Sequence, residues 1–181
     1  MHKKSMIIIA MVAVMLVSIV PVFAAKPTSP AASNGLDKGK NDHLYLYEKD
    51  SDTWEIVEDA AWGKLNINVK KGQFVLNAHK LEPETDYVLI CYQDSWPGTG
   101  SLLLGNGTSN EEGNVHIKGS VDYETLPSYV YDIDGTQVEG SKIWLVLAAD
   151  FDKEAPEMDA WNPSEYLFEF DLLNKQEVVP E

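Results

Sequence analysis

The chain has 181 residues, of which 44% are hydrophobic and 24% charged, as in a globular protein with room for one ordinary domain. Its 14 basic residues, all lysines, stand against 29 acidic ones, so the net charge is -15 at pH 7. Nucleic acids and anionic membranes repel such a surface, so we expect no nucleic-acid partner and no membrane insertion beyond an N-terminal leader. The single Cys91 cannot form an intrachain disulfide.

Residues 1–25 read as a signal peptide. Lys3 and Lys4 precede an uncharged run of 20 residues from Met6 to Ala25, and Val22-Phe23-Ala24 provides the small-residue pattern of a cleavage site. The alternative is an uncleaved anchor, because a helix of that length could cross the core of a bilayer. Pro21 and the small residues after it favour cleavage, and we expect the protein to be secreted or held at the cell surface.

The rest of the chain divides into three parts. Residues 26–41 are predicted to be a flexible linker, because Leu36 is their only large apolar side chain and cannot repay the entropy of ordering. Residues 42–174 are predicted to form the folded domain. Residues 175–181 form a short polar tail without an apolar membrane anchor.

The domain is predicted to consist of short strands. Residues 64–69 alternate polar and apolar side chains, as do residues 115–121, and a period of two is typical of half-buried strands. Further strands are predicted at 43–47, 54–58, 73–79, 87–92, 101–104, 143–148 and 166–171, with turns at 70–72, 105–107, 111–114 and 134–135. Without a sustained helical period, this pattern argues for an antiparallel sandwich or barrel. The predicted fold class is all-β, an antiparallel β-sandwich of the immunoglobulin or fibronectin III-like type with about nine strands.

One local motif supports a sandwich. Residues 81–87, Leu-Glu-Pro-Glu-Thr-Asp-Tyr, resemble the tyrosine corner of fibronectin type III-like domains. This resemblance implies that Tyr87 caps a bend by hydrogen bonding to the backbone. In the strand that follows, Tyr87, Leu89 and Cys91 are expected to share the inward face.

A second resemblance spans most of the domain. His43-Leu-Tyr-Leu-Tyr-Glu-Lys, Trp54-Glu-Ile-Val-Glu-Asp and Lys142-Ile-Trp-Leu-Val are similar to segments of a family of exported, largely archaeal proteins of unknown function. The resemblance implies a secreted single domain. It carries no catalytic residue that could be transferred to this chain.

Acidic residues gather at several predicted turns, and one cluster is a candidate calcium site. Asp132, Asp134 and Glu139 surround an Asp-x-Asp-Gly sequence, which is part of an EF-hand loop and would contribute to the six to eight oxygen ligands that Ca²⁺ prefers. The EF-hand pattern is incomplete, with Val130 at its first position and Ser141 where the bidentate glutamate belongs. A solvated acidic turn is therefore the alternative. Calcium is the one cofactor that the sequence suggests.

Two tryptophans lie in predicted loops and are candidate ligand-binding residues together with a neighbouring amide: Trp96, Trp161 and Asn162. A loop tryptophan can stack on one face of a sugar while polar groups hold the hydroxyls, so the expected partner is a glycan or another cell-surface component. The alternative is that these rings plug the end of the core. Trp144, within an apolar strand, is interpreted mainly as a core residue.

No serine-nucleophile, zinc-protease or phosphate-loop motif is present in the sequence. The predicted function is therefore an exported module for cell-surface structure or ligand recognition, with no catalytic residue assigned. The alternative is an extracellular hydrolase that uses carboxylates. A hydrolase requires a deep pocket lined by at least two carboxylates, whereas a recognition module requires only a shallow aromatic face.

Overall fold

Strands make up most of the computed structural model, which describes residues 41–68, 70–133 and 135–177. The all-β prediction is confirmed. The predicted signal peptide and, except for Asn41, the predicted linker lie outside the described residues. No helix within the described part of the chain is long and apolar enough to cross a membrane.

Ten strands form the main sheet: β1 (Asn41–Tyr47), β2 (Trp62–Asn68), β3 (Gln73–His79), β4 (Asp86–Tyr92), β5 (Leu102–Thr108), β6 (Val115–Ser120), β7 (Tyr129–Ile133), β8 (Thr136–Leu147), β11 (Leu167–Glu169) and β12 (Leu173–Glu177). A small second sheet pairs β9 (Phe151–Asp152) with β10 (Glu157–Met158). Three single 3-10 turns complete the described elements: η1 (Tyr123–Thr125), η2 (Ala148–Asp150) and η3 (Pro163–Glu165).

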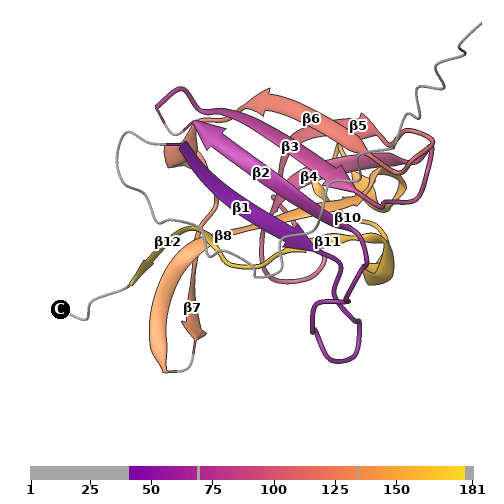
Figure 1. Ribbon diagram of the computed structural model, residues 1–181. Coiled ribbons are helices and arrows are strands. Elements are labelled where there is room, and N and C mark those ends of the chain that lie inside the picture. The colour runs from indigo at the N-terminus through magenta and orange to yellow at the C-terminus, as the bar shows by residue number, and fades with distance from the viewer. Residues whose placement is uncertain (1–40, 69, 134, 178–181) are drawn as a thin grey trace, which may run out of the picture.

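The main sheet follows the order β5-β4-β8-β11-β1-β2-β3-β6, and β7 and β12 both pair with β8. It curls until its end strands β5 and β6 come together, so the antiparallel sheet is nearly closed, as the predicted sandwich-or-barrel architecture requires (Figure 1). β7, the first half of β8 and β12 project beyond the rest of the sheet (Figure 1).

Glycines in β5 allow the two end strands to approach. A Cβ added to Gly105 would lie 2.8 Å from Cγ2 of Ile117, and one added to Gly107 would lie 3.0 Å from Cγ2 of Val115. The prediction of a turn at 105–107 is therefore wrong, because β5 runs straight through these residues. The glycines serve close packing rather than a change of direction.

Two other predictions are corrected. Residues 54–58 form a loop rather than a strand, because Trp54 has a φ of 59° and only an isolated bridge joins Lys49 to Ile56. β7, β12 and the first half of β8 were not predicted. β12 extends to Glu177, within the predicted polar tail, by pairing with Val138 of β8.

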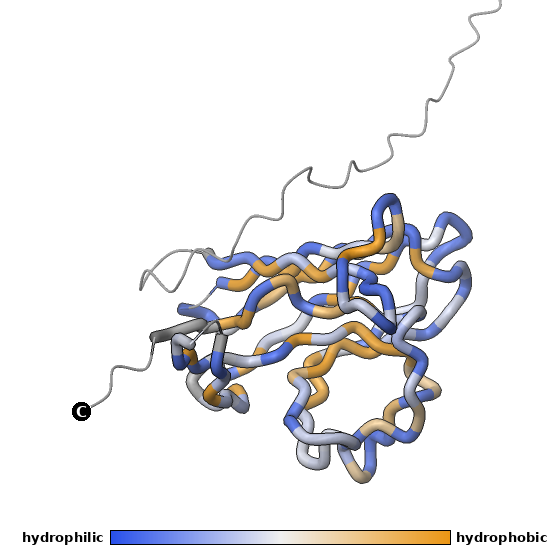
Figure 2. Tube along the Cα trace, turned by 90° about the horizontal axis from the view of Figure 1, so that it is seen from below, coloured by the Kyte–Doolittle hydropathy of each residue, from blue (hydrophilic) through white to orange (hydrophobic). Residues whose placement is uncertain are grey.

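The central strands are buried on both faces. Tyr87, Leu89 and Cys91 of β4 point into the main core, which confirms the predicted inward face. The alternate residues of β4 belong to a second apolar cluster with β8, β11 and the segment 151–166: Val88, Ile90, Tyr92, Trp144, Val146, Phe151, Met158, Tyr166 and Phe168. Figure 2 shows the hydrophobic residues along the strands and hydrophilic residues at most of the connecting loops.

The predicted tyrosine corner stays a prediction. The Tyr87 ring is 1% exposed, and its hydroxyl makes no hydrogen bond with a described residue. Burial raises the pKa of Tyr87 to about 12, and the nearby backbone N–H of Glu82 opposes this only in part.

We predict that Gly105→Ala destabilises the domain by about 1–3 kcal/mol, because its methyl group overpacks the contact with Ile117. Urea unfolding measures this cost. In an Ile117→Ala background the same substitution should cost clearly less, since the clashing Cγ2 atom is gone. Equal costs in both backgrounds would contradict the proposed closure of the sheet by glycine packing.

Candidate functional site

The outer face of the central strands carries an aromatic floor. Tyr92 of β4 and Trp144 of β8 stack with ring centroids 3.7 Å apart at an angle of 12°. Phe168 of β11 packs edge-on against Trp144, with centroids 5.2 Å apart. All three rings are buried, and they extend the second apolar cluster toward the surface.

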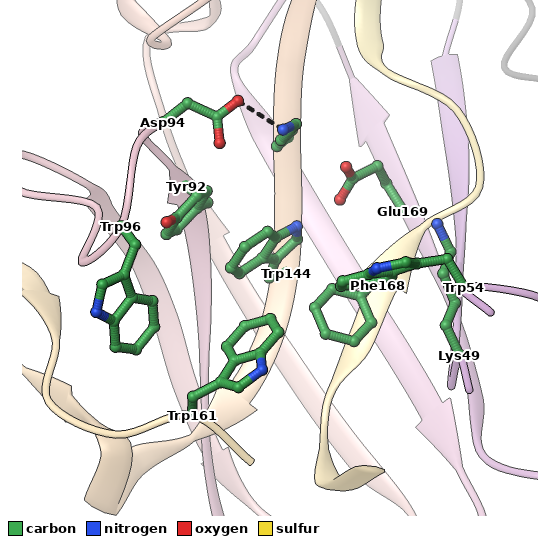
Figure 3. A pocket seen from close by; sticks show the side chains of 10 residues that line it. Lys49, Trp54, Tyr92, Asp94, Trp96, Trp144, Trp161, Phe168 and Glu169 are labelled. Carbon is green, nitrogen blue, oxygen red and sulfur yellow. Dashed lines mark hydrogen bonds and ion pairs between the residues drawn. The ribbon is translucent and has the colours of Figure 1, made fainter. Parts of the chain in front are cut away.

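Three loop tryptophans stand over this floor: Trp54, Trp96 and Trp161. They are 48%, 51% and 40% exposed, respectively. Together with the floor they line a cavity of about 830 Å³ that opens to solvent (Figure 3). Trp161 packs against the other three tryptophans of the pocket. Its ring centroid lies 5.7 Å from that of Trp96, 6.2 Å from that of Trp54 and 5.9 Å from that of Trp144.

An aspartate turn holds Trp54 in place. Oδ1 of Asp50 accepts hydrogen bonds from the backbone N–H of Asp52 and from both the backbone N–H and hydroxyl of Thr53, at 2.9–3.1 Å. These bonds lower the pKa of Asp50. They close the turn that puts Trp54 in the left-handed region and its ring 5.1 Å from that of Phe168.

The loop that carries Trp96 is tied to its neighbours. Gly98 lies so close to the Tyr92 ring that a Cβ would approach it to 2.4 Å, and its φ of 81° also requires glycine. The N–H of Gly100 donates to the carbonyl of Pro156, at 3.0 Å, and that of Met158 to Pro97, at 2.8 Å. These two backbone hydrogen bonds therefore join the loop that carries Trp96 to the segment that precedes Trp161.

A buried carboxylate organises the segment that carries Trp161. Oδ2 of Asp150, which is 6% exposed, accepts hydrogen bonds from the Tyr166 hydroxyl at 2.6 Å and from Nδ2 of Asn162 at 2.8 Å. The backbone N–H of Asn162 in turn donates to the Tyr166 hydroxyl, at 3.1 Å. These hydrogen bonds hold Asn162 in place, and with it the neighbouring Trp161.

Charged groups line the other side of the pocket (Figure 3). Nζ of Lys142 donates to Oδ2 of Asp94, at 2.5 Å. Glu169 is 9% exposed, and its Oε2 has no hydrogen-bond partner among the described residues. Lys49 is half-buried nearby, and desolvation lowers the pKa of its ammonium while the charge of Glu169 partly restores it.

Glu169 occupies the place where β11 leaves β8. β11 pairs with β8 at Phe168 and Trp144, but the next residue pairing with β8 on that side is Leu173. Burial raises the pKa of Glu169 to about 7, because its own backbone N–H, the charges of Lys49 and Lys142 and the indole N–H of Trp144 offset only part of the desolvation. Its proton therefore titrates near neutral pH.

The structure brings Trp96 and Trp161 together, 5.7 Å apart, and places both in the pocket wall. Asn162, predicted alongside them, instead uses its amide to bind Asp150. Trp144, interpreted as a core residue, is buried in the pocket floor. Sequence reasoning missed Glu169 and Lys49, because no local pattern shows that β11 separates from β8 at this point.

The candidate calcium residues lie on the hairpin of β7 and β8, away from the pocket. Oδ1 of Asp132 accepts from the N–H of Gly135 at 2.9 Å, and Oε1 of Glu139 accepts from the Ser128 hydroxyl at 2.6 Å. Asp134 lies outside the described residues. Within the described part of the chain, no group of three acidic, histidine or cysteine side chains could hold a metal ion. Calcium binding by the full set stays a prediction.

Comparison with protein-family models, with curated proteins and with solved structures found no match. The resemblance to exported, largely archaeal proteins therefore stays a prediction.

We predict that Tyr166→Phe destabilises the domain by about 1–3 kcal/mol, because Asp150 loses its shortest hydrogen bond in a buried position. Urea unfolding of Tyr166→Phe, Asp150→Asn and the double variant forms a cycle that isolates the interaction. If the two single costs simply add, the contact does not stabilise this segment.

We also predict that the domain becomes less stable as the pH rises from 4.5 to 7. Glu169 holds its proton in the folded state up to a pKa of about 7, whereas the unfolded chain releases it near 4.5. The folded state therefore binds more protons in this window, and the stability lost across it is about 3 kcal/mol. Glu169→Gln should remove this part of the slope and be more stable than the parent at pH 8. Equal slopes for the parent and Glu169→Gln would contradict the assigned burial.

Proposed function

We propose that this protein is an exported recognition module that binds a glycan in the aromatic pocket. The observation that carries the proposal is the set of three tryptophans that remain 40–51% exposed although they are gathered over one aromatic floor. Exposed apolar clusters of this kind mark binding sites on soluble proteins. A ligand with one apolar and one polar side, such as a sugar ring, matches a pocket with aromatic and charged sides.

The hydrogen bonds within the loops support a binding site that is already formed before the ligand binds. Trp54, Trp96 and Trp161 come from three different loops, each fixed by side-chain or backbone bonds rather than by the rings themselves. Holding the rings in position before binding lowers the entropy that a ligand must repay. The export part of the proposal rests on the N-terminal sequence, which lies outside the described residues.

One observation favours a second candidate function, a carboxylate-dependent hydrolase. The pocket is lined by two carboxylates, Asp94 and Glu169, and the latter has a pKa raised to about 7. A protonated glutamate in an apolar pocket could act as a general acid. Against this function, Asp94 is engaged by Lys142, so the described pocket residues include no second unpaired carboxylate beside Glu169 to activate water or attack the substrate.

We predict that Trp96→Ala and Trp161→Ala each weaken binding about tenfold or more to any glycan selected by an array screen of the full chain. Trp96 is 51% exposed, so the melting temperature of Trp96→Ala should stay close to that of the parent. Trp161→Ala should lower it, because this ring packs against Trp54, Trp96 and Trp144. Val130→Ala, at a 52% exposed position on β7, is the matched control and should bind normally.

Three outcomes separate the alternatives. An array without any bound glycan, or variants that bind like the parent, would contradict the recognition function. Release of sugar from the bound glycan, abolished in Glu169→Ala, would favour the hydrolase instead. An unchanged glycan after long incubation agrees with recognition alone.

A further inference from the structure

Two charged residues in the pocket, Glu169 and Lys49, lack a direct ion-pair partner among the described residues. Oε2 of Glu169 is buried without a hydrogen-bond partner among the described residues, and a buried acceptor left in that state is costly. Lys49 lies close enough to interact with Glu169 through its charge, yet these two residues form no direct ion pair. The other two charges of the pocket, on Asp94 and Lys142, already satisfy one another.

This unmatched pair consists of one acceptor and one donor. Once Glu169 has released its proton, its carboxylate oxygens only accept hydrogen bonds. The ammonium of Lys49 only donates them, whereas each hydroxyl of a sugar can do both. Two adjacent hydroxyls can therefore donate to Glu169 and accept from Lys49 at the same time. A ligand with this arrangement satisfies both groups without adding a charge.

The aromatic rings of the pocket do not lie in one plane but meet at steep angles and surround the cavity. Trp96 meets Trp161 at 79°, and Trp54 meets Phe168 at 76°. Trp144, on the floor, is inclined to Trp161 at 52°. A polymer chain lying across a surface would need rings exposed in one plane, whereas rings at steep angles enclose a single ring of the ligand.

We propose that the pocket takes one neutral pyranose residue and recognises two of its adjacent hydroxyls, one through Glu169 and the other through Lys49. This inference rests on the proposed glycan-binding function and names its ligand class. Two ammonium groups and two carboxylates line the pocket, so a charged sugar would meet a like charge of either sign. The two lysines likewise oppose a quaternary ammonium ion, which an aromatic cage alone would attract.

The test is a chemical double-mutant cycle on the full chain. Methyl pyranosides of neutral sugars are titrated by calorimetry, and the tightest binder is compared with its monodeoxy analogues. We expect removal of either one of two adjacent hydroxyls to weaken binding about tenfold. In Glu169→Ala the penalty for one of these hydroxyls should disappear while the other persists, and in Lys49→Met the roles should be reversed.

Glu139→Ala and Lys118→Met, on β8 and β6 and outside the pocket, are the matched controls and should keep both penalties. If Glu169→Ala does not fold, Glu169→Gln serves in its place, because the amide keeps the volume while changing the acceptor. If no glycan on the array binds either, the proposed function itself is overturned. If array glycans bind and every methyl pyranoside fails, only the single-residue ligand class is overturned. Binding with deoxy penalties that no variant changes would overturn only the roles of Glu169 and Lys49. Tighter binding of tetramethylammonium than of any pyranoside would contradict the ligand class.

Discussion

The burial of the central strands on both faces is the constraint on which the rest of the structure depends. From Tyr87 to Tyr92 every residue of β4 is buried, and β8 and β11 continue the same two-sided pattern. One face is covered by the curled sheet itself. The opposite face needs other elements to cover it, and the chain provides these in the loops after β1 and β4 and in the segment between β8 and β11.

This covering is complete at one end of the outer face and incomplete at the other. Phe151, Met158 and Tyr166 close over Val88 and Val146, forming a small second core. Over Tyr92, Trp144 and Phe168, the covering residues are loop tryptophans that stay partly exposed and leave a cavity of about 830 Å³. The same need for apolar cover thus gives both the stability of the domain and its candidate binding site.

Acidic residues have a structural part in this arrangement. Asp50 and Asp152 each accept backbone hydrogen bonds within an exposed turn, and Asp150 fixes Tyr166 from a buried position. Asp42 and Glu169 are the exceptions, because each has one buried carboxylate oxygen without a partner among the described residues. Of the two, only Glu169 lines the pocket, at the point where β11 departs from β8. An unsatisfied buried group at the edge of a pocket makes Glu169 a candidate functional residue.

The sequence predicted the features that depend on local pattern. Period-two alternation located β2 and β6, and further short strands were predicted where β3 and β4 lie. The expected inward face of β4 placed Cys91 in the core. It did not predict the course of β5, since glycines that permit close strand packing look like a turn. It selected Trp96 and Trp161 because a tryptophan in a loop can stack on a sugar, but Trp144 and Glu169 acquire their roles only from the pairing of distant strands.

The most direct test of the pocket uses the five tryptophans themselves. Four of them, Trp54, Trp96, Trp144 and Trp161, line the pocket, whereas Trp62 packs against Tyr45 in a separate cluster. Indole N–H signals in a two-dimensional NMR spectrum of the labelled protein report on all five during titration with the selected pyranoside. We expect saturable shifts for the four pocket tryptophans and none for Trp62. Shifts confined to Trp62, or no saturable shift at any indole, would contradict it.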